Sequence, residues 1–407
     1  MSGRPGFLGE GVPPRWGYQT SFWQRRQPAF WLFVATLVLT GLVALGQQLD
    51  LIEVAPGAWL LALVLLLPYA IPVLLVIYLL DLYEREPVSI LAAAVLWGGV
   101  AATTLSIYTN APLAELIFKV TADPVFTAEW SAALTAPFVE EGFKAIGVIL
   151  LVSLARAEMD DVLDGFVWGA MVGLGFLLVE NVFYFVGAFV ETGGSYAGLF
   201  EIFLIRIVGA GPYSHFLYTG LIGMGVAYYT TRGDVPRGRR LVVGTALAAA
   251  GVGAHFFWNS PLLGELLGAA GPLDWALYVT VKGLPMLIGL LILVRLARQR
   301  ERTWFERFTA AHVDDGTITA EEMHELGSLR RRWRARREAA RIGGAAAGRL
   351  KGQVQRQQIN LAMVASRVGG TDHPDLLRQR DLVRALKAQY AAATAGPPGA
   401  AGREGPG

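Results

Sequence analysis

The sequence predicts an all-α polytopic membrane protein, with about eight transmembrane helices and a cytoplasmic, basic, helical tail. Of its 407 residues, 54% are hydrophobic and only 17% are charged, whereas a soluble domain carries about 25% charged residues. Apolar runs long enough to cross a bilayer, which takes about 20 residues, recur as far as residue 296. The chain has no cysteine, so disulfides, a thiolate nucleophile and a cysteine-ligated metal are excluded.

Eight apolar runs are expected to be the spans, and each is about as long as a bilayer is thick. They cover residues 29–47, 58–80, 88–108, 132–154, 163–187, 211–230, 241–259 and 274–296. Two further segments, 112–120 and 197–209, are apolar but short. We expect them to be interfacial or re-entrant rather than spanning.

The orientation of the chain follows from its arginine and lysine residues. The N-terminal tail and every second loop are arginine-rich, at Arg4, Arg15, Arg25, Arg26, Arg85, Arg156, Arg232, Arg237, Arg239 and Arg240. The loops between them hold only Lys119 and Arg206. Because cytoplasmic loops carry the excess of positive charge, we expect both termini to lie in the cytoplasm.

Four regions are expected along the chain: a cytoplasmic tail over 1–28, a transmembrane core over 29–297, a basic helical region over 298–390, and a disordered tail of Ala, Gly and Pro over 391–407. The core ends in "RLARQRERTWFERF", a basic amphipathic stretch of the kind that lies on an anionic membrane surface. Further on, Thr319 and Glu322 have the spacing of a helix capping box. A calcium loop at this point is excluded, because its first two ligands would be Ala311 and Val313.

Ionisable residues within the expected spans usually face the interior of the bundle and mark a functional site, and six of those present here are the most informative. They are Glu140, Glu141, Lys144, Glu180, His215 and His255, accompanied by Asn181 and Asn259. With the expected topology and about 1.5 Å per helical residue, the positions on four different helices lie about 6 to 12 Å from the outer surface. Agreement in depth predicts one site, open to the extracytoplasmic side.

The spacing of these residues predicts which of them share a helix face. Glu140 and Glu141 precede Lys144 by four and three residues, so the lysine can offset both carboxylates. His255 and Asn259 are also four apart and share a face. Arg206, near a helix end, is interpreted as a snorkelling or capping group.

A stripe of small residues, Gly165, Gly169 and Gly173, lets another helix approach closely. Glu180 lies about two turns beyond it on the same side, so it is expected to face protein rather than lipid.

This set of side chains allows hydrolysis by two routes. It can hold a divalent metal while a glutamate activates water, or a glutamate can act directly as the base, with His and Asn donors stabilising the oxyanion. Neither H-E-x-x-H nor a G-x-S-x-G elbow is present in the spans. Two other classes of function are also compatible with the sequence. One is a proton-coupled transporter, which would use the carboxylates as a proton relay, and the other is a non-catalytic membrane scaffold.

Four motifs in order carry a family resemblance. "EEGFK" at 140–144 matches E-E-x-x-K, Phe176 to Asn181 gives F-x-x-x-E-N, His215 follows, and "HFFWN" at 255–259 gives H-x-x-x-N. Together they resemble the PrsW family of bacterial intramembrane proteases, which is related to the CAAX-processing and bacteriocin-processing protease superfamily. The resemblance covers about residues 80–300.

The resemblance implies an intramembrane endopeptidase in a bacterial inner membrane. It implies a membrane-anchored protein substrate such as an anti-sigma factor, cut near the extracytoplasmic face, with the lipid bilayer as a partner and no nucleic acid. Glu140, Glu141 and His215 would be catalytic. Lys144, Glu180, Asn181, His255 and Asn259 would support them or stabilise the oxyanion. A divalent metal such as zinc would be held by Glu180, His215 and His255. Glu180 stands where the CAAX-type relatives have a histidine.

Overall fold

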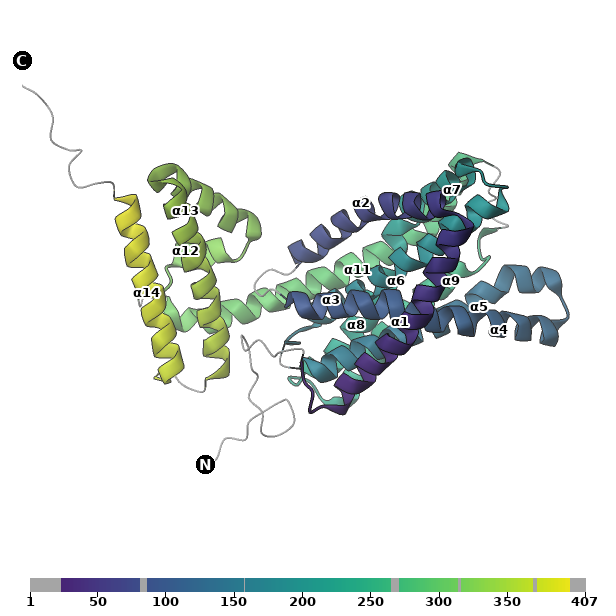
Figure 1. Cartoon of the computed structure of the whole chain (residues 1–407). Coiled ribbons are helices and arrows are strands. Elements are labelled where there is room, and N and C mark those ends of the chain that lie inside the picture. Colours follow the sequence, from purple (N-terminus) through teal and green to yellow (C-terminus); the bar gives the residue numbers. More distant parts are fainter. Residues whose placement is uncertain are drawn as a thin grey trace, which may run out of the picture. The chain divides into compact units, whose positions relative to one another are not determined.

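The computed structural model describes residues 23–80, 86–156, 158–264, 271–313, 316–368 and 372–395. These residues are helical almost throughout, and within them the only strand-like pairing is one bridge between Val313 and Ile318. The helices of the first part (Figure 1) are α1 Pro28–Val54, α2 Pro56–Leu80, α3 Val88–Leu96, η1 Trp97–Ala102, α4 Thr103–Thr121, α5 Pro124–Leu154, α6 Val162–Glu191, α7 Tyr196–Phe203, η2 Leu204–Gly209, η3 Gly211–Tyr213, α8 His215–Thr231 and α9 Arg237–Asn259. The remaining helices are α11 Pro272–Thr309, η4 Ala310–His312, α12 Ala320–Leu326, α13 Leu329–Arg367 and α14 Pro374–Thr394.

Six helices in the described residues are long and apolar enough to cross a membrane, or seven if a bent pair counts as one span. The six are 28–54, 56–77, 88–121, 162–191, 237–259 and 273–309. The expected count of eight is therefore not confirmed. The helices that fall short are α5, which carries Glu140, Glu141 and Lys144 in its apolar half, and α8, which has only 17 residues. Both of these helices carry motif residues, as do α6 and α9, which pass as candidate spans.

The two short apolar segments behave differently. The segment 112–120 is not a separate interfacial piece, because it is the end of one continuous helical run of 34 residues over 88–121. Ala122 then adopts a left-handed backbone conformation, and the Asp123 side chain caps α5 by accepting bonds from two backbone N–H groups, so α4 and α5 form a hairpin (Figure 1). The segment 197–209 lies in α7 and η2 and meets α8 at a bend of 50°, as expected of a re-entrant or broken element.

Helix α6 packs against α8 along the predicted glycine stripe. A Cβ added at Gly169 would stand 2.2 Å from the carbonyl oxygen of Thr219, and one added at Gly173 would stand 2.3 Å from that of His215. No side chain other than hydrogen fits such a contact, since it is well below van der Waals distance. The stripe therefore brings the backbone of α8 directly onto α6 and fixes the height of His215 beside it.

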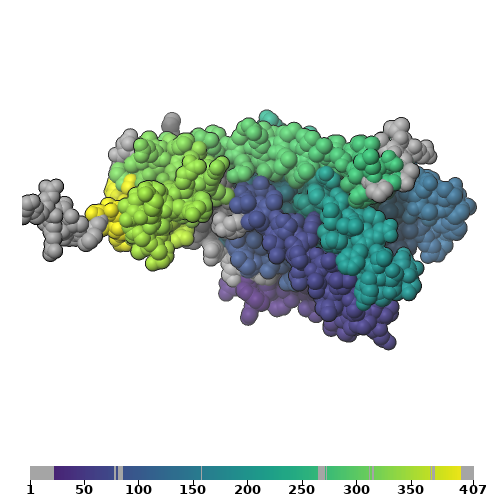
Figure 2. Space-filling model, turned by 90° about the horizontal axis from the view of Figure 1, so that it is seen from above, coloured from purple at the N-terminus to yellow at the C-terminus, as the bar shows by residue number. Residues whose placement is uncertain are grey.

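The outer helices present large apolar side chains on their exposed faces. On α1 and α2, Leu39, Leu42, Leu60, Leu67 and Ile71 are each more than half exposed, and Figure 2 shows α2, in indigo, on the outer surface. Leucine and isoleucine in this density on an outer face are typical of a lipid-facing surface. By contrast, α6 is buried over most of its length.

The chain divides into two compact units, and the division falls within α11, at residue 298. The second unit contains α12, α13 and α14. The predicted capping box at the start of α12 is confirmed, since the Thr319 side chain accepts from the N–H of Glu322, and the Glu322 carboxylate accepts from the N–H of Thr319. Residues 391–394, expected to be disordered, are the last turn of α14. Residues 1–22 and 396–407 lie outside the described part of the chain.

Candidate active site

Helix α5 carries the three charged residues that the sequence placed in one cluster. Glu141 and Lys144 are completely buried, and Glu140 is 5% exposed. Charges buried to this degree must be paired. The Lys144 ammonium lies 2.7 Å from Oε1 of Glu141 and 3.5 Å from Oε2 of Glu140, and it also stands 3.7 Å from the centre of the Phe176 ring. The expected offset of both carboxylates by Lys144 is therefore present.

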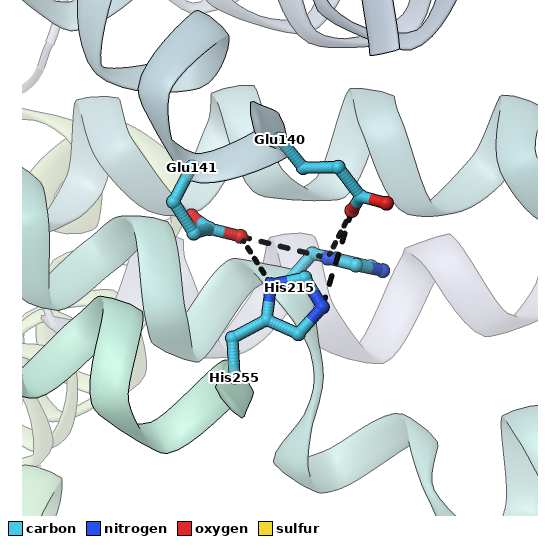
Figure 3. A group of neighbouring side chains, drawn as sticks. All are labelled: Glu140, Glu141, His215 and His255. Atoms are coloured by element: carbon cyan, nitrogen blue, oxygen red, sulfur yellow. Dashed lines mark hydrogen bonds and ion pairs between the residues drawn. The ribbon is translucent and has the colours of Figure 1, made fainter. Parts of the chain in front are cut away.

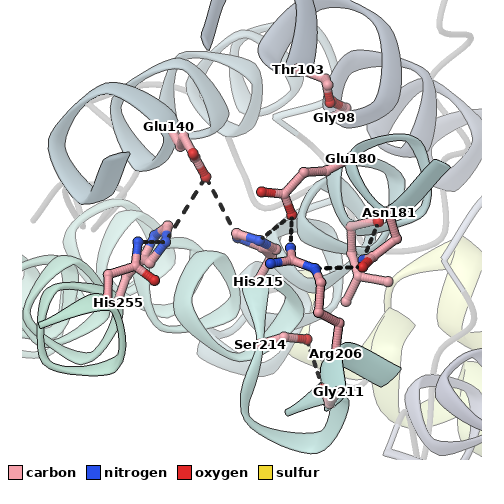
Figure 4. Close-up of polar contacts among 12 residues, drawn as sticks. Gly98, Thr103, Glu140, Glu180, Asn181, Arg206, Gly211, Ser214, His215 and His255 are labelled. Atoms are coloured by element: carbon pink, nitrogen blue, oxygen red, sulfur yellow. Dashed lines mark hydrogen bonds and ion pairs between the residues drawn. The ribbon is translucent and has the colours of Figure 1, made fainter. Parts of the chain in front are cut away.

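The His215 ring, at the start of α8, lies beside Glu140 and Glu141 (Figure 3) and contacts Glu180 on α6 (Figure 4). Its Nδ1 lies 2.9 Å from the Lys144 ammonium, and its Nε2 lies 3.0 Å from Oε2 of Glu180. An ammonium has donors only, so Nδ1 accepts, and Nε2 carries the proton and donates to Glu180. The contacts thus select one neutral tautomer, with its lone pair directed at the α5 cluster.

The His255 ring, from α9, approaches the cluster from the other side. Its Nδ1 lies 3.0 Å from Oε1 of Glu141, and its Nε2 lies 3.2 Å from Nδ2 of Asn259 and 4.0 Å from Oε2 of Glu140. A carboxylate accepts only, so Nδ1 donates, and Nε2 accepts from the Asn259 amide. The expected face shared by His255 and Asn259 is confirmed by this contact.

Thr219 and Asn110 complete the surroundings of the two glutamates. The Thr219 hydroxyl, fully buried on α8, donates to Oε2 of Glu141 at 2.7 Å. The Asn110 amide on α4 donates to Oε1 of Glu140 at 3.1 Å. Neither was expected from the sequence, although Thr219 follows His215 by four residues and so shares its helix face.

Arg206 is interpreted from the sequence as a snorkelling or capping group, but in the structure it binds two side chains of α6. It lies in η2, and its guanidinium donates to Oε2 of Glu180 and to Oδ1 of Asn181, both at 2.8 Å (Figure 4). It also stacks at 3.5 Å over the Tyr184 ring. Arg206 therefore holds the carboxylate that in turn binds His215.

Lys282 on α11 is a second buried cation, 1% exposed, and it holds the end of α9. Its ammonium donates to the carbonyl oxygens of Trp258 and Ser260 and to the Tyr278 hydroxyl, at 2.6 to 2.9 Å. The last carbonyls of a helix lack partners within the helix, so Lys282 satisfies two of them beside Asn259. The only sequence signal for it was the rarity of an ionisable residue inside a span.

A cavity of about 500 Å³ opens beside these groups. Glu140, Glu180, His215, His255 and Asn259 all line it, whereas Glu141 and Lys144 do not. The lining residues from α4 and α5 are mostly small, among them Ala111, Ala114, Ser131, Ala132 and Ala136. The other helices contribute aromatic rings to the lining, among them Tyr184, Tyr218, Trp258, Trp275 and Tyr278. The site thus combines buried charge with a space of the size of a small-molecule or peptide pocket.

Comparison with known proteins identifies the family. Residues 86–292, half of the chain, match the PrsW family intramembrane metalloproteases. The chain belongs to the PrsW family. The protease PrsW of Geobacillus kaustophilus (strain HTA426) is 33% identical over 115 residues, which are 28% of this chain and 48% of that protein. The chain therefore spans about half the length of the curated relative it matches. No solved structure matches it.

Because the PrsW family is described as metalloproteases, the donor groups decide whether a metal fits here. Glu140, Glu141, His215 and His255 each offer one ligand atom, and these atoms all lie within 4.8 Å of one another. Two carboxylates and two neutral imidazoles are a donor set that suits zinc. The carboxylate of Glu180 on the outer nitrogen of His215 matches the usual support of a metal-binding histidine. The residues fit a divalent metal, and Lys144 contacts three of the four.

Proposed function

We propose that the chain is an intramembrane endopeptidase that hydrolyses a peptide bond of a membrane-anchored protein at this site. The observation that carries the proposal is the convergence of Glu140, His215 and His255 on one cavity, in a chain of the PrsW family. Buried carboxylates and neutral imidazoles at hydrogen-bond distance are the groups that move protons and position water in hydrolysis.

The two glutamates have different roles in this proposal. Glu140 lines the cavity, and its carboxylate accepts from the Asn110 amide at 3.1 Å and lies 3.5 Å from the Lys144 ammonium. With these two partners, the carboxylate can still take a proton from a water in the cavity. Glu141 is fully buried and holds Lys144, Thr219 and His255 at 2.7 to 3.0 Å. Glu140 is the general base, and Glu141 is the residue that orders the charges around it.

The two histidines are held by separate supports. Arg206 fixes Glu180, and Glu180 fixes the Nε2–H side of His215. Asn259 donates to Nε2 of His255. Each ring is therefore held in a defined tautomer, which is what a proton carrier or a ligand requires.

Tyr218 is the donor that we assign to the carbonyl of the substrate. It lines the cavity, stacks on His255 with ring centres 4.9 Å apart, and its buried hydroxyl has no hydrogen-bond partner among the described residues. A buried hydroxyl without a partner is unfavourable by about 1 to 3 kcal/mol. A substrate carbonyl would satisfy it, and the developing oxyanion would do so more strongly.

A divalent metal such as zinc would be held by the carboxylates of Glu140 and Glu141 and by His215 and His255, with Glu180 supporting His215. When bound, it supplies Lewis-acid polarisation of the scissile carbonyl. Lys144 would then give up its contact to Nδ1 of His215, and His255 would give up one of its present contacts, while Glu180 would continue to orient the His215 ring.

The substrate class follows from the position of the site. With the orientation expected from the arginine-rich loops, these residues would lie near the extracytoplasmic face, at a depth where a membrane-anchored protein emerges from the bilayer. The small lining residues on α4 and α5 allow a peptide backbone to approach closely, and the aromatic rings of the lining offer contacts for its side chains. An anti-sigma-factor-like protein is a substrate of this kind.

The test compares three versions of the full chain in bacterial cells: wild type, Glu140→Gln and Glu129→Gln. Glu129 is an exposed glutamate on the same helix, so its variant controls for expression and for the loss of one carboxylate. Proteomics of the membrane fraction and of the external fraction identifies proteins that lose an extracytoplasmic segment. Fragments are expected with wild type and Glu129→Gln and to be absent with Glu140→Gln.

The proposal is overturned if Glu140→Gln yields the same fragments as wild type, or if wild-type membranes yield none under the stresses that damage the cell envelope. A purified substrate identified in this way then supplies kcat and KM for the variants discussed below.

A further inference from the structure

The first half of α13 presents a basic, aromatic face to solvent. Arg330, Trp333, Arg334, Arg337 and Arg341 are all exposed, with Trp333 57% and the Arg341 side chain 75% exposed. At 3.6 residues per turn, the five positions fall within an arc of about 100°. We call this set the α13 basic face.

The opposite side of the same helix is fixed inside the second unit. Arg332 is 6% and Ala339 is 1% exposed. Gln355, in the later half of α13, donates to the carbonyl oxygen of Arg332 at 3.1 Å and accepts from the Arg336 guanidinium. These buried contacts determine which side of the helix is turned outward.

A break in α13 allows its two halves to meet. Gly344 has φ of +74°, a conformation that favours glycine. A Cβ at the neighbouring Gly343 would stand 2.4 Å from the carbonyl oxygen of Ala393 in α14. The turn at Gly343 and Gly344 and the packing of α14 against it therefore help to determine which side of α13 faces solvent.

The composition of the face is unusual for a solvated helix. Trp333 is among the few large apolar side chains exposed in this unit, and the Arg337 guanidinium lies 4.4 Å from the centre of its ring. Glu338 is the acidic residue beside the face, and it pairs with Arg341. Glu338 therefore does not offset the charges of Arg330, Arg334 and Arg337, which lie beside the exposed indole. Arginines beside an exposed indole are typical of helices that lie in the headgroup region of a membrane.

We propose that the α13 basic face binds the surface of an anionic lipid bilayer. The guanidinium groups match the phosphates of the headgroups in charge and in geometry, and the Trp333 indole suits the boundary between headgroups and acyl chains. The bilayer is within reach, because α13 follows soon after 273–309, the last candidate span. The binding adds a membrane contact to the second unit that is separate from the spans and from the candidate active site.

The test uses the full chain in nanodiscs, one set of phosphatidylcholine alone and one with about 30% phosphatidylglycerol. Because the chain has no cysteine, Glu338→Cys carries one fluorophore at the edge of the face. Nitroxide-labelled headgroups quench it on contact. We expect quenching to be at least threefold stronger with phosphatidylglycerol, and to fall sharply at about 1 M salt, where the screening length drops to about 3 Å.

Two triple variants separate this face from positive charge in general. One neutralises the face, R330Q, R334Q and R337Q. The other neutralises three exposed arginines elsewhere in the unit, R349Q, R356Q and R378Q. Both lose the same charge, but only the first is expected to abolish the extra quenching. Trp333→Ala is expected to weaken the part that persists at high salt.

The proposal is overturned if quenching is equal in the two lipid compositions, a comparison that needs no variant and so does not depend on their folding. It is also overturned if the two triple variants behave alike. A fluorophore that responds to a short DNA duplex, and not to phosphatidylglycerol, would assign the face to nucleic acid instead.

Discussion

The Lys144 ammonium donates a hydrogen bond to Nδ1 of His215 across 2.9 Å. The same ammonium lies 2.7 Å from Oε1 of Glu141. It thus contacts the lone pair of His215 and the carboxylate of Glu141, both of which a divalent metal would use. Its positive charge lies against three of the four possible metal ligands, Glu140, Glu141 and His215. Lysine and metal therefore compete for the same atoms.

This competition predicts that Lys144→Gln raises the affinity of the purified protein for zinc, by about tenfold or more, because a competing cation is removed from the group. Zinc affinity is measured by titration against a chelator of known affinity. Lys119→Gln removes an exposed lysine outside the site and should leave the affinity unchanged. A lower zinc affinity in Lys144→Gln would show that the ammonium supports the metal rather than competing with it.

The two glutamates are expected to separate activity from stability. Glu140→Gln should lower kcat about a hundredfold or more with a small change in the thermal unfolding midpoint in detergent. Glu141→Gln should lower the midpoint clearly, because removing one partner of a buried ion pair costs about 3–5 kcal/mol, and Glu141 holds three side chains at once. Equal losses of midpoint in the two variants would contradict the distinction between base and support.

The sequence predicted much of the site because helical spacing is a strong constraint. Glu140, Glu141 and Lys144 share a turn of α5, and His255 and Asn259 share a turn of α9, so their contacts follow from positions three and four apart. The glycine stripe on α6 likewise predicted a close neighbour, which proved to be α8. These are local patterns, and they hold whatever the arrangement of the whole bundle.

Contacts between distant segments could not be predicted in this way. Arg206 in η2 contacts Glu180 on α6, and Lys282 on α11 contacts the end of α9, so each pair joins two different helices. The count of spans was uncertain for a related reason. The three charged residues of α5 lower its hydropathy, and these are the residues that are expected to carry the chemistry. Helix α8 is short, with 17 residues.

Arg206 should act on the reaction through Glu180. Arg206→Gln is expected to lower kcat by about tenfold or more, because Glu180 and the His215 tautomer lose their support. Arg206→Lys should restore only part of it, since a lysine cannot reproduce the forked contact to Glu180 and Asn181. In a double-mutant cycle, Arg206→Gln should add little to Glu180→Gln. Additive losses in kcat would mean that Arg206 acts on the substrate directly.

The packing of α6 on α8 offers a test with an internal control. Gly169→Ala places a Cβ 2.2 Å from the Thr219 carbonyl, so the helices must separate, at about 1–3 kcal/mol, and Thr219 and His215 move from Glu141. We expect a lower unfolding midpoint and a lower kcat. Gly187→Ala, on the same helix, meets nothing within 4 Å and should be neutral or slightly stabilising. Similar effects of both changes would rule out the close approach as the cause.

Tyr218→Phe is expected to change stability and activity in opposite directions. The Tyr218 hydroxyl is buried and has no hydrogen-bond partner among the described residues. Its removal should therefore leave the unfolding midpoint unchanged or raise it, because an unsatisfied polar group is lost while the ring still stacks on His255. If the hydroxyl donates to the oxyanion, kcat should fall by about 10²-fold, with a smaller change in KM. The readout is the pair of values, midpoint and kcat, on the same preparation. A variant with full activity would remove Tyr218 from the reaction and leave the role of oxyanion donor to Asn259.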